Sequence, residues 1–336
     1  MKLIRTFHAV GQGAFYTERF YEGDKNVFNA VYDCGTSNSQ NNLKKSIHAE
    51  FAKGSTINYL FISHFHYDHY SGIKYLTEHC NIEHFVVPVI TPQLLAESTL
   101  HNYIWVEETN NRIERFEDML EFTREIMTAE NLIEIGENRN PQSIAVQNSS
   151  SWVYYPYNPS QNPINDIIEE MGKNNSLTGL ADAFIQKDFG RISELIRNAK
   201  LSELRTVYKE AFGNHHCYVM PVYSGYENPS INNDERVCLF TGDYDGSDLT
   251  RINALTNPIL DKWDKVGTFQ VPHHGSKYSS CIELYSNKDR KYVISSCDQS
   301  RNHHPHNETL GYICSNSFVQ LQLVKINNTL SYHYMI

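Results

Sequence analysis

The spacing of hydrophobic residues divides the chain into short apolar runs and longer segments with helical periodicity. The runs at 59–62 and 83–90 are rich in aromatic and β-branched residues, which predicts buried strands. Apolar residues recur at helical spacing over 40–53, and a second helix is expected from about 72 to 79. A strand–helix–strand order of this kind is typical of layered α/β folds.

The two ends of the chain add further predicted strands. The first 35 residues alternate in polarity around a Gly11-Gln12-Gly13 turn, which indicates antiparallel strands. From 214 onward, short apolar runs that end in polar turns recur, and the tail alternates like a closing hairpin. The predicted strands of these regions are 3–10, 14–20, 26–32, 218–223, 237–240, 266–271, 292–296, 318–326 and 331–336, with a helix near 248–260.

Residues 91–213 interrupt this order. A strand at 151–156 continues the main fold, but a helix is predicted over 112–127. The Asn- and Pro-rich stretch 158–175 predicts a loop, and two helices are expected within 177–211. We interpret the whole segment as a mainly helical insertion. The pattern leaves open whether it only packs on the sheets, covers a substrate or binds a protein partner.

Composition and charge are those of a soluble globular protein. The 336 residues are 40% hydrophobic and 20% charged, and no apolar run of about eighteen residues predicts a membrane span. The N-terminus shows no secretory signal, and the seven cysteines include no C-x-x-C pair, so we expect a cytoplasmic protein without membrane contact. The net charge of −10 disfavours a broad basic surface for duplex nucleic acid, although bound divalent ions would add positive charge where a phosphate lies.

The strongest chemical signal is the sequence H-F-H-Y-D-H at 64–69, directly after the predicted strand. Loops at the carboxyl ends of strands are where α/β folds place their sites. Neutral imidazole and carboxylate suit zinc and related divalent ions. Residues so close together cannot all reach one ion, so we expect His64 and His66 on one ion and Asp68 and His69 on a second.

Four further short motifs lie beside predicted strands. They are V-G-Q-G at 10–13, D-C-G at 33–35, T-G-D at 241–243 and V-P-H-H-G-S at 271–276. Each alone is compatible with an ordinary turn. Their order along the chain, together with the histidine-rich motif, is much harder to attribute to chance.

This set of motifs resembles the signature of the metallo-β-lactamase-fold hydrolases. The resemblance implies an α/β fold of four layers, an αββα sandwich. It also implies one such domain over 1–336, with the helical insertion at about 91–213.

The resemblance extends to the roles of single residues. Asp33 is expected to orient a metal-binding histidine, as supporting carboxylates commonly do. Asp243 is expected to bridge two ions, and one more histidine ligand is expected ahead of its strand. His215 and His216 are both candidates for that ligand. The expected metal ligands are therefore His64, His66, Asp68, His69, His215 or His216, Asp243 and His274.

A finer resemblance, carried by the glycine motifs, V-P-H-H-G-S and His304-Pro305, is to the hydrolase domain of the bacterial DNA-uptake channel protein ComEC and its soluble relatives. That domain is thought to be a metal-dependent nuclease. By this resemblance, Asp68 and His304 are catalytic, and His304 contacts phosphate or protonates the leaving group. Ser276 or Lys277 would help to hold the strand. The channel's membrane-spanning part is absent from the sequence, so DNA import is not implied.

We therefore expect a cytoplasmic bacterial hydrolase with two divalent ions. The leading hypothesis is a phosphodiesterase or nuclease that cleaves DNA or RNA with a hydroxide shared by the ions. Zinc suits the histidine-rich ligands, and manganese suits the mixed nitrogen and oxygen set nearly as well. The alternatives are hydrolysis of a small phosphodiester, thioester or lactam, and a non-catalytic scaffold subunit, which loss of a ligand would indicate.

Overall fold

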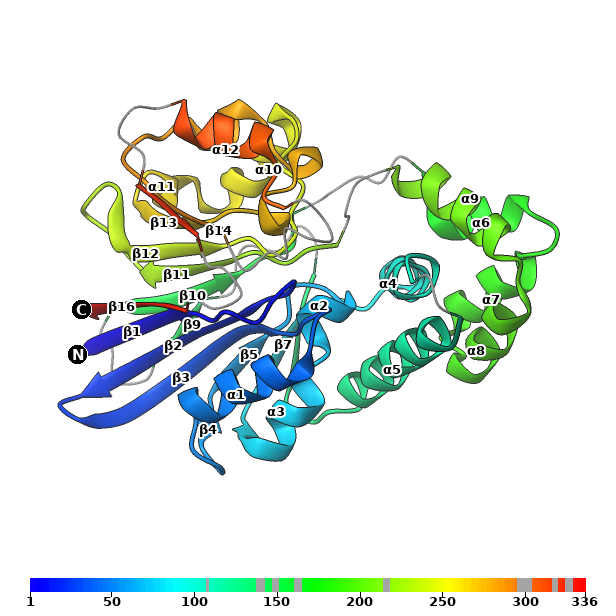
Figure 1. Cartoon of the computed structure of the whole chain (residues 1–336), viewed down its shortest axis with the longest axis horizontal. Coiled ribbons are helices and arrows are strands. Elements are labelled where there is room, and N and C mark those ends of the chain that lie inside the picture. Colours follow the sequence, from blue (N-terminus) through cyan, green and yellow to red (C-terminus); the bar gives the residue numbers. More distant parts are fainter. Residues whose placement is uncertain are drawn as a thin grey trace.

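The computed structural model describes residues 1–106, 109–136, 143–146, 151–159, 165–213, 218–294, 304–315, 320–323 and 329–336. Within them, two seven-stranded sheets pack face to face and helices lie on both outer faces (Figure 1). This mixed α/β arrangement confirms the expected four-layer sandwich.

The strand order of the first sheet is β16-β1-β2-β3-β5-β7-β8, and that of the second is β15-β14-β13-β12-β11-β10-β9. The first sheet contains β1 (Lys2–Phe7), β2 (Phe15–Glu22), β3 (Lys25–Cys34), β5 (Tyr59–Phe61), β7 (Phe85–Pro88), β8 (Leu132–Ile135) and β16 (Leu330–Met335). The second contains β9 (Ile144–Ala145), β10 (Trp152–Pro156), β11 (Val222–Tyr226), β12 (Asp234–Phe240), β13 (Val266–Gln270), β14 (Lys291–Ile294) and β15 (Gln320–Leu323). A small separate sheet pairs β4 (Thr56–Ile57) with β6 (Asn81–Ile82).

Each sheet is antiparallel on one side and parallel on the other. Strands β1, β2 and β3 form an antiparallel meander, whereas β3, β5, β7 and β8 are parallel. In the second sheet, β12, β13, β14 and β15 are parallel. Parallel strands present their carboxyl ends at one edge, so the loops that follow β5, β12 and β13 can meet there.

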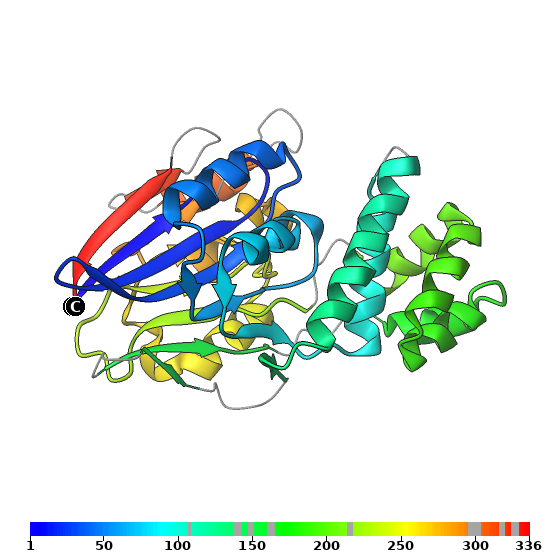
Figure 2. The ribbon, with the colours of Figure 1, turned by 90° about the horizontal axis from the view of Figure 1, so that it is seen from below.

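Helices cover both outer faces of the sandwich. In Figures 1 and 2, α1 and α3 lie on the first sheet, while α10 and α12 lie on the second. The helices are α1 (Gln40–Glu50), α2 (Tyr67–Tyr70), α3 (Ile73–His79), α4 (Pro92–Ile104), α5 (Thr109–Met127), α6 (Ile167–Lys173), α7 (Thr178–Gln186), α8 (Phe189–Asn198), α9 (Leu201–Phe212), α10 (Leu249–Thr256), α11 (Leu260–Trp263) and α12 (Asn307–Cys314). Single 3₁₀ turns are η1 (Asn257–Ile259), η2 (His273–Gly275), η3 (Lys277–Ser279) and η4 (Ile282–Tyr285).

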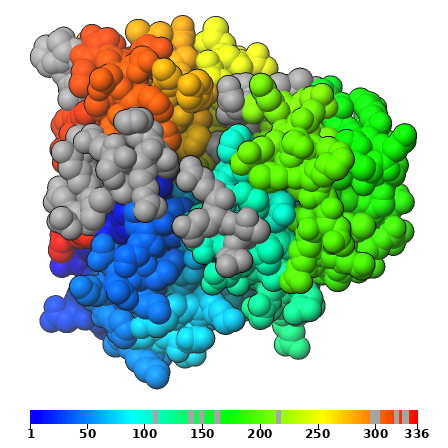
Figure 3. Space-filling model, turned by 45° about the vertical axis from the view of Figure 1, so that its right-hand side comes forward, coloured from blue at the N-terminus to red at the C-terminus, as the bar shows by residue number. Residues whose placement is uncertain are grey.

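The helices α4 to α9 form a lobe beside the sandwich (Figures 1 and 3). The lobe packs internally, with contacts of α4 to α5, α6, α7 and α9. The same stretch of chain also supplies β8 to the first sheet and β9 and β10 to the second. The interpretation of 91–213 as an insertion within one domain stays a prediction.

Several local predictions were wrong. The stretch expected as a loop contains α6, which begins after Asp166, whose side chain accepts hydrogen bonds from the backbone N–H groups of Ile168 and Glu169. The segment expected to hold two helices holds α7, α8 and α9. The tail does not form a hairpin, because β15 joins β14 in the second sheet and β16 joins β1 in the first.

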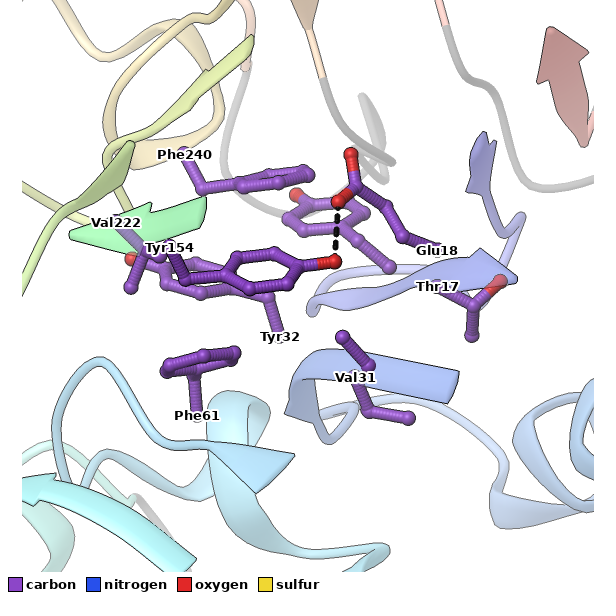
Figure 4. A pocket seen from close by; sticks show the side chains of 10 residues that line it. Thr17, Glu18, Val31, Tyr32, Phe61, Tyr154, Val222 and Phe240 are labelled. Carbon is purple, nitrogen blue, oxygen red and sulfur yellow. Dashed lines mark hydrogen bonds between the residues drawn. The ribbon is translucent and has the colours of Figure 1, made fainter. Parts of the chain in front are cut away.

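The core between the two sheets is aromatic but contains one buried ion pair. Rings of Tyr32, Phe61, Tyr154 and Phe240 surround a cavity of about 10 Å³ (Figure 4). Beside it, the buried Glu18 carboxylate accepts a hydrogen bond from the Tyr154 hydroxyl at 2.7 Å. It also accepts one from the buried Arg5 guanidinium. The middle of the sandwich therefore carries charge, but the charge is balanced by opposite charge and hydroxyl groups.

Candidate metal centre

The histidine-rich motif lies where the parallel strands end. The chain leaves β5 and enters the short helix α2, which stands at the edge of the sandwich facing α4 (Figure 1). Loops after β12 and β13 bring residues from the second sheet to the same place. The side chains that gather there are His64, Asp68, His69, Asp243 and His274.

These side chains form two overlapping groups. In each group the candidate ligand atoms lie within 4.8 Å of one another; one consists of His64, His69 and Asp243, and the other of Asp68, His69 and His274. The Asp243 Oδ1 lies 3.2 Å from the His69 Nε2, and its Oδ2 lies 4.0 Å from the His64 Nε2. The His274 Nε2 lies 3.4 Å from the Asp68 Oδ2. Asp243 thus faces both groups.

Two core residues set the orientation of two of these rings. The Asp33 Oδ2 lies 2.8 Å from the His69 Nδ1, and the Ser63 hydroxyl lies 2.8 Å from the His64 Nδ1. Ser63 also donates its N–H and hydroxyl to Asp33, each at 2.7 Å. The Nδ1 atoms of His64 and His69 therefore contact Ser63 and Asp33, and the Nε2 atoms of the same two rings are directed at Asp243. The contact expected between Asp33 and a histidine of this loop is present.

The glycine motifs form a close-packed floor under α2. A Cβ on Gly13 would lie 2.3 Å from the Gly35 carbonyl oxygen, and one on Gly35 would lie 2.5 Å from the Asp68 carbonyl carbon. The Ala14 N–H also donates to the Asp68 carbonyl at 3.1 Å. Any larger residue at either glycine would displace the backbone that carries Asp68.

Asp243 is positioned by a residue that sequence analysis did not single out. The Gln270 Oε1 accepts hydrogen bonds from the backbone N–H groups of Thr241 and Gly242, at 2.7 and 2.8 Å. Gly242 has a φ of 55°, and a Cβ there would lie 2.8 Å from the Ser63 side chain. Gln270 and Gly242 thus fix the turn that directs Asp243 into the site. Gln270 lies within the predicted strand 266–271, which by itself gives no signal of this role.

His66 is buried in the same loop but stands apart from the two groups. Its ring centroid lies 4.4 Å from that of His64. Its Nε2 lies 2.9 Å from an Oε1 of Glu97, a residue of α4. If His66 holds an ion, the ligand atom would be Nδ1, because Nε2 faces Glu97. Glu97 is a further contact that sequence analysis missed.

The H-H-G motif presents two histidines. His274, the preferred candidate ligand, is buried and lies in the second group. His273 is partly exposed, and its Nε2 lies 3.7 Å from the Asp243 Oδ2 while its Nδ1 lies 2.8 Å from the Ser279 hydroxyl. Both backbones adopt positive φ, 47° and 53° respectively, a conformation that concentrates at functional sites.

His304 borders the site from the loop after β14. Its ring centroid lies 5.5 Å from that of His273 and 6.3 Å from that of His274. Burial, together with His274 and His306, lowers the pKa of His304 to about 3, so the ring is neutral at pH 7. A neutral imidazole offers one N–H donor and one acceptor.

Two other predicted residues are placed less directly. Ser276 is buried, and its hydroxyl accepts a hydrogen bond from the Tyr278 N–H at 3.3 Å, so it caps η3. Lys277 is at the surface, where its Nζ lies 3.0 Å from the Glu308 Oε1. His215 and His216 lie outside the described residues.

The site is strongly polarised. Burial alone would raise the pKa of Asp243, but His69, His273 and His274 hold it well below its usual value. Burial likewise opposes protonation of His69, whereas Asp243, Asp33 and Asp68 raise its pKa. Three carboxylates thus converge on one imidazole. Such a concentration of negative charge, directed at buried nitrogen atoms, favours a bound cation.

The donor set fits a divalent metal. Imidazole nitrogen and carboxylate oxygen are the usual ligands of zinc and of related transition metals. Asp68 is the most open of the five gathered side chains, with 16% of its surface exposed, so the site is reached from that side. These residues could hold one or two ions.

Comparisons with known proteins agree with this description. Residues 21–122, which include the histidine-rich motif, match the family model of the metallo-beta-lactamase superfamily. A search of curated proteins found no match.

Three solved structures illustrate the fold comparison. An archaeal metallo-beta-lactamase superfamily protein from Sulfolobus tokodaii is 12% identical, with a TM-score of 0.31; the match covers 73% of this chain but 65% of the archaeal protein. A subclass B3 metallo-beta-lactamase from a soil metagenome library is 9% identical over 93% of this chain and 92% of its own, with a TM-score of 0.35. The metallo-beta-lactamase MIM-1 from Novosphingobium pentaromativorans is 10% identical over 81% and 78%, with a TM-score of 0.32.

The matched residues include β3, β5 and β7 of the first sheet and the histidine-rich loop, and the two-sheet architecture extends over the rest of the described chain. Residues 21–122 are therefore similar to the metallo-beta-lactamase superfamily, whose members are mostly metal-dependent hydrolases.

Proposed function

We propose that the protein is a two-metal phosphodiesterase, in first place a nuclease that cleaves DNA or RNA. The observation that supports this proposal is the pair of overlapping imidazole–carboxylate groups that share His69. Asp243 belongs to the first group and also lies 3.9 Å from His274 of the second. Such a pair of groups suits two divalent ions a few Å apart, the arrangement found in many phosphoryl-transfer enzymes. Zn²⁺ is the first choice of metal and Mn²⁺ the second.

Ions bound here would supply a water nucleophile at neutral pH and positive charge for the substrate's oxygens. The protein's own part is to hold the ligands in place through Asp33, Ser63 and Gln270. His304, beside His274, is proposed to donate a hydrogen bond to a phosphate oxygen. To protonate the leaving oxygen it would first have to take up a proton, because its lowered pKa keeps the ring neutral at pH 7. The side chain of His215 or His216 is proposed as a further ligand of the ion nearer to His64.

Residues next to the site could hold a nucleic acid strand. Tyr278 is 52% exposed, and its ring lies 6.0 Å from that of His306. A base could stack on its face, as bases do on exposed aromatic rings. The ion pair of Lys277 with Glu308 is at the surface, where such pairs contribute little, so Lys277 can be drawn to a phosphate instead.

The test combines metal analysis with a panel of substrates. The purified chain should contain two ions and cleave labelled single- or double-stranded DNA or RNA with Zn²⁺ or Mn²⁺. Asp243→Ala should lose metal and cleavage together, and His66→Ala should do the same. The matched control is Asp234→Asn, a buried carboxylate paired with Arg236 away from the site, which should keep both.

The other outcomes separate the alternatives. Two ions without nucleic acid cleavage would contradict the nuclease and favour a small phosphodiester, thioester or lactam, which chromogenic substrates of each class would test. No bound metal would favour a non-catalytic scaffold. Retained metal in both ligand variants would show that the ligand assignment is wrong.

The proposal includes a compartment and a possible partner. Among the described residues, Cys34, Cys80, Cys238, Cys281 and Cys314 form no disulfide, which fits a reducing cytoplasm. No helix in the described part of the chain has the length and apolarity to cross a membrane. The lobe of α4 to α9 is proposed as the surface for a protein partner.

A further inference from the structure

Helix α4 is buried on nearly all sides, yet it carries a carboxylate. Glu97 is 3% exposed and is surrounded on its helix by buried residues such as Leu94 and Leu100. Burying an ionised carboxylate is costly unless it is paired and hydrogen-bonded. Its position therefore calls for a partner, and that partner is His66 of the candidate metal centre, whose Nε2 lies 2.9 Å from Oε1.

The carboxylate is itself held by two hydroxyls. Tyr208 of α9 donates to the Glu97 Oε1 at 2.9 Å, and Ser98 donates to the Oε2 at 3.1 Å. Helices α4 and α9 pack against each other, so the Tyr208 hydroxyl reaches Glu97 across the contact between these two helices. Hydroxyls from α4 and α9 thus hold the Glu97 carboxylate in the position in which it contacts the His66 imidazole.

The same helix also clamps the backbone on both sides of His66. Asn102 of α4 donates its Nδ2 to the Phe65 carbonyl at 2.8 Å, and its Oδ1 accepts from the Tyr67 N–H at 3.0 Å. Asn102 is 3% exposed. His66 is therefore held by α4 through its ring and through the peptide groups before and after it.

This support differs in origin from that of the other histidines. His64 and His69 are oriented by Ser63 and Asp33, which belong to the sandwich. His66 is oriented by the helical lobe. A carboxylate on one imidazole nitrogen fixes the ring and raises its basicity, which strengthens metal binding at the other nitrogen.

We propose that Glu97 is a positioning residue that presents the Nδ1 of His66 to one of two ions, and that Tyr208 links this contact to the packing of α4 on α9. The inference rests on the proposed two-metal function. It makes the helical lobe part of the metal centre, so that anything that shifts α4 against α9 changes the affinity of one ion.

The experiment is a titration of the full metal-free chain with Zn²⁺ against a competing chelator, repeated with Co²⁺ to follow the absorption bands of each site. Glu97→Gln keeps the size and an acceptor oxygen but removes the charge. It should weaken one ion by about tenfold to a hundredfold and leave the other unchanged. Only one set of Co²⁺ bands should change at a given metal concentration.

Two further variants separate positioning from general destabilisation. Glu170→Gln replaces a carboxylate of the lobe that is 9% exposed and pairs with Lys173 on its own helix α6, and it should bind both ions as the wild type does. Tyr208→Phe should weaken the same ion as Glu97→Gln, by a smaller factor, so the test does not depend on one variant that folds poorly. Urea midpoints of the metal-free variants should match that of Glu170→Gln.

The results distinguish this inference from the proposed function. A wild-type chain that binds no metal would overturn both. Two ions in the wild type, bound equally tightly by Glu97→Gln and Tyr208→Phe, would overturn the inference alone. Equal weakening of both ions would also overturn it, because Glu97 would then act on the fold and not on His66.

Discussion

Two buried charge clusters lie in the sandwich, and they are built in opposite ways. In the middle, Arg5 and Glu18 pair with each other. The Tyr154 hydroxyl donates to the same carboxylate (Figure 4), and so does the Ser224 hydroxyl. At the edge, the carboxylates of Asp33, Asp68 and Asp243 converge on imidazoles, and the ion-pair contacts that they make there are with histidines.

The difference separates a cluster that balances its own charge from one whose residues fit a bound cation. The central cluster balances its own charge, so it needs nothing from outside. The edge cluster gathers Asp33, Asp68 and Asp243 around His69 and keeps a route to solvent at Asp68. A buried excess of negative charge is tolerated where a cation completes it.

The largest expected effect concerns the cation itself. If the site holds metal as proposed, each ion should stabilise the folded chain by about 3 kcal/mol when free metal exceeds its dissociation constant a hundredfold. A chelator should therefore lower the melting temperature of the wild-type chain. Asp243→Ala should melt at one temperature with and without chelator, whereas Asp234→Asn should respond as the wild type does. Scanning calorimetry measures the melting temperatures of the wild type and of both variants. If chelator lowers the melting temperature of Asp243→Ala, the edge cluster does not depend on a cation held by Asp243.

The central cluster should respond to the loss of one partner and not to metal. Arg5→Met leaves the Glu18 carboxylate buried without its counter-ion, which should cost about 3–5 kcal/mol of unfolding free energy. Metal stoichiometry of the folded fraction should stay at two. The double variant Arg5→Met with Glu18→Gln should regain part of the loss, as urea unfolding would show. Loss of metal in the Arg5 variant would mean that the clusters are coupled.

A third test separates ligands from reactive groups at the edge. His304→Ala should keep both ions but reduce the turnover rate about a hundredfold, because a hydrogen bond or proton to the substrate is lost. Metal analysis and cleavage rates on one preparation measure this. Full activity would remove the role proposed for His304.

The smallest effect concerns His8, a buried histidine outside these two clusters, whose Nε2 lies 3.8 Å from the Glu50 Oε2. His8 lies in the sandwich with its Nε2 3.0 Å from the Thr17 hydroxyl, and burial together with Arg19 lowers its pKa from 6.5 to about 3. The unfolded chain takes up a proton below its ordinary pKa while the folded chain does not, so stability falls as the pH drops from 6.5 toward 3. The loss should reach roughly 2 kcal/mol near pH 5. His8→Gln should flatten that part of the pH profile of urea unfolding, and an unchanged slope would contradict the assignment.

The parts of the molecule that sequence analysis predicted are those with local signals. Strand periodicity and the order of motifs gave the sandwich, which the structure confirms. The H-x-H-x-D-H, T-G-D and H-H-G motifs each stand at a strand end, so their side chains were expected to meet. His64, Asp68, His69, Asp243 and His274 do meet, whereas His66 lies outside both groups. Their role as metal ligands stays a prediction.

The parts that were missed depend on tertiary contacts. Helix α4 is buried almost all round, so it has no polar stripe, and neither the helix nor Glu97 could be singled out. Gln270 acts through a turn in a neighbouring loop. In the tail, alternation identified strands but not their partners, because β15 and β16 pair with strands far apart in the sequence.

The distribution of the gathered residues along the chain has a consequence for synthesis. Asp68 and His69 come from the first sheet, but Asp243 and His274 come from loops of the second. A ribosome needs on the order of 10–40 s to add the roughly 200 residues between His69 and His274. During that time the nascent chain has exposed histidines but no complete pair of ion sites. The proposed hydrolytic chemistry would therefore be absent until the second sheet has docked.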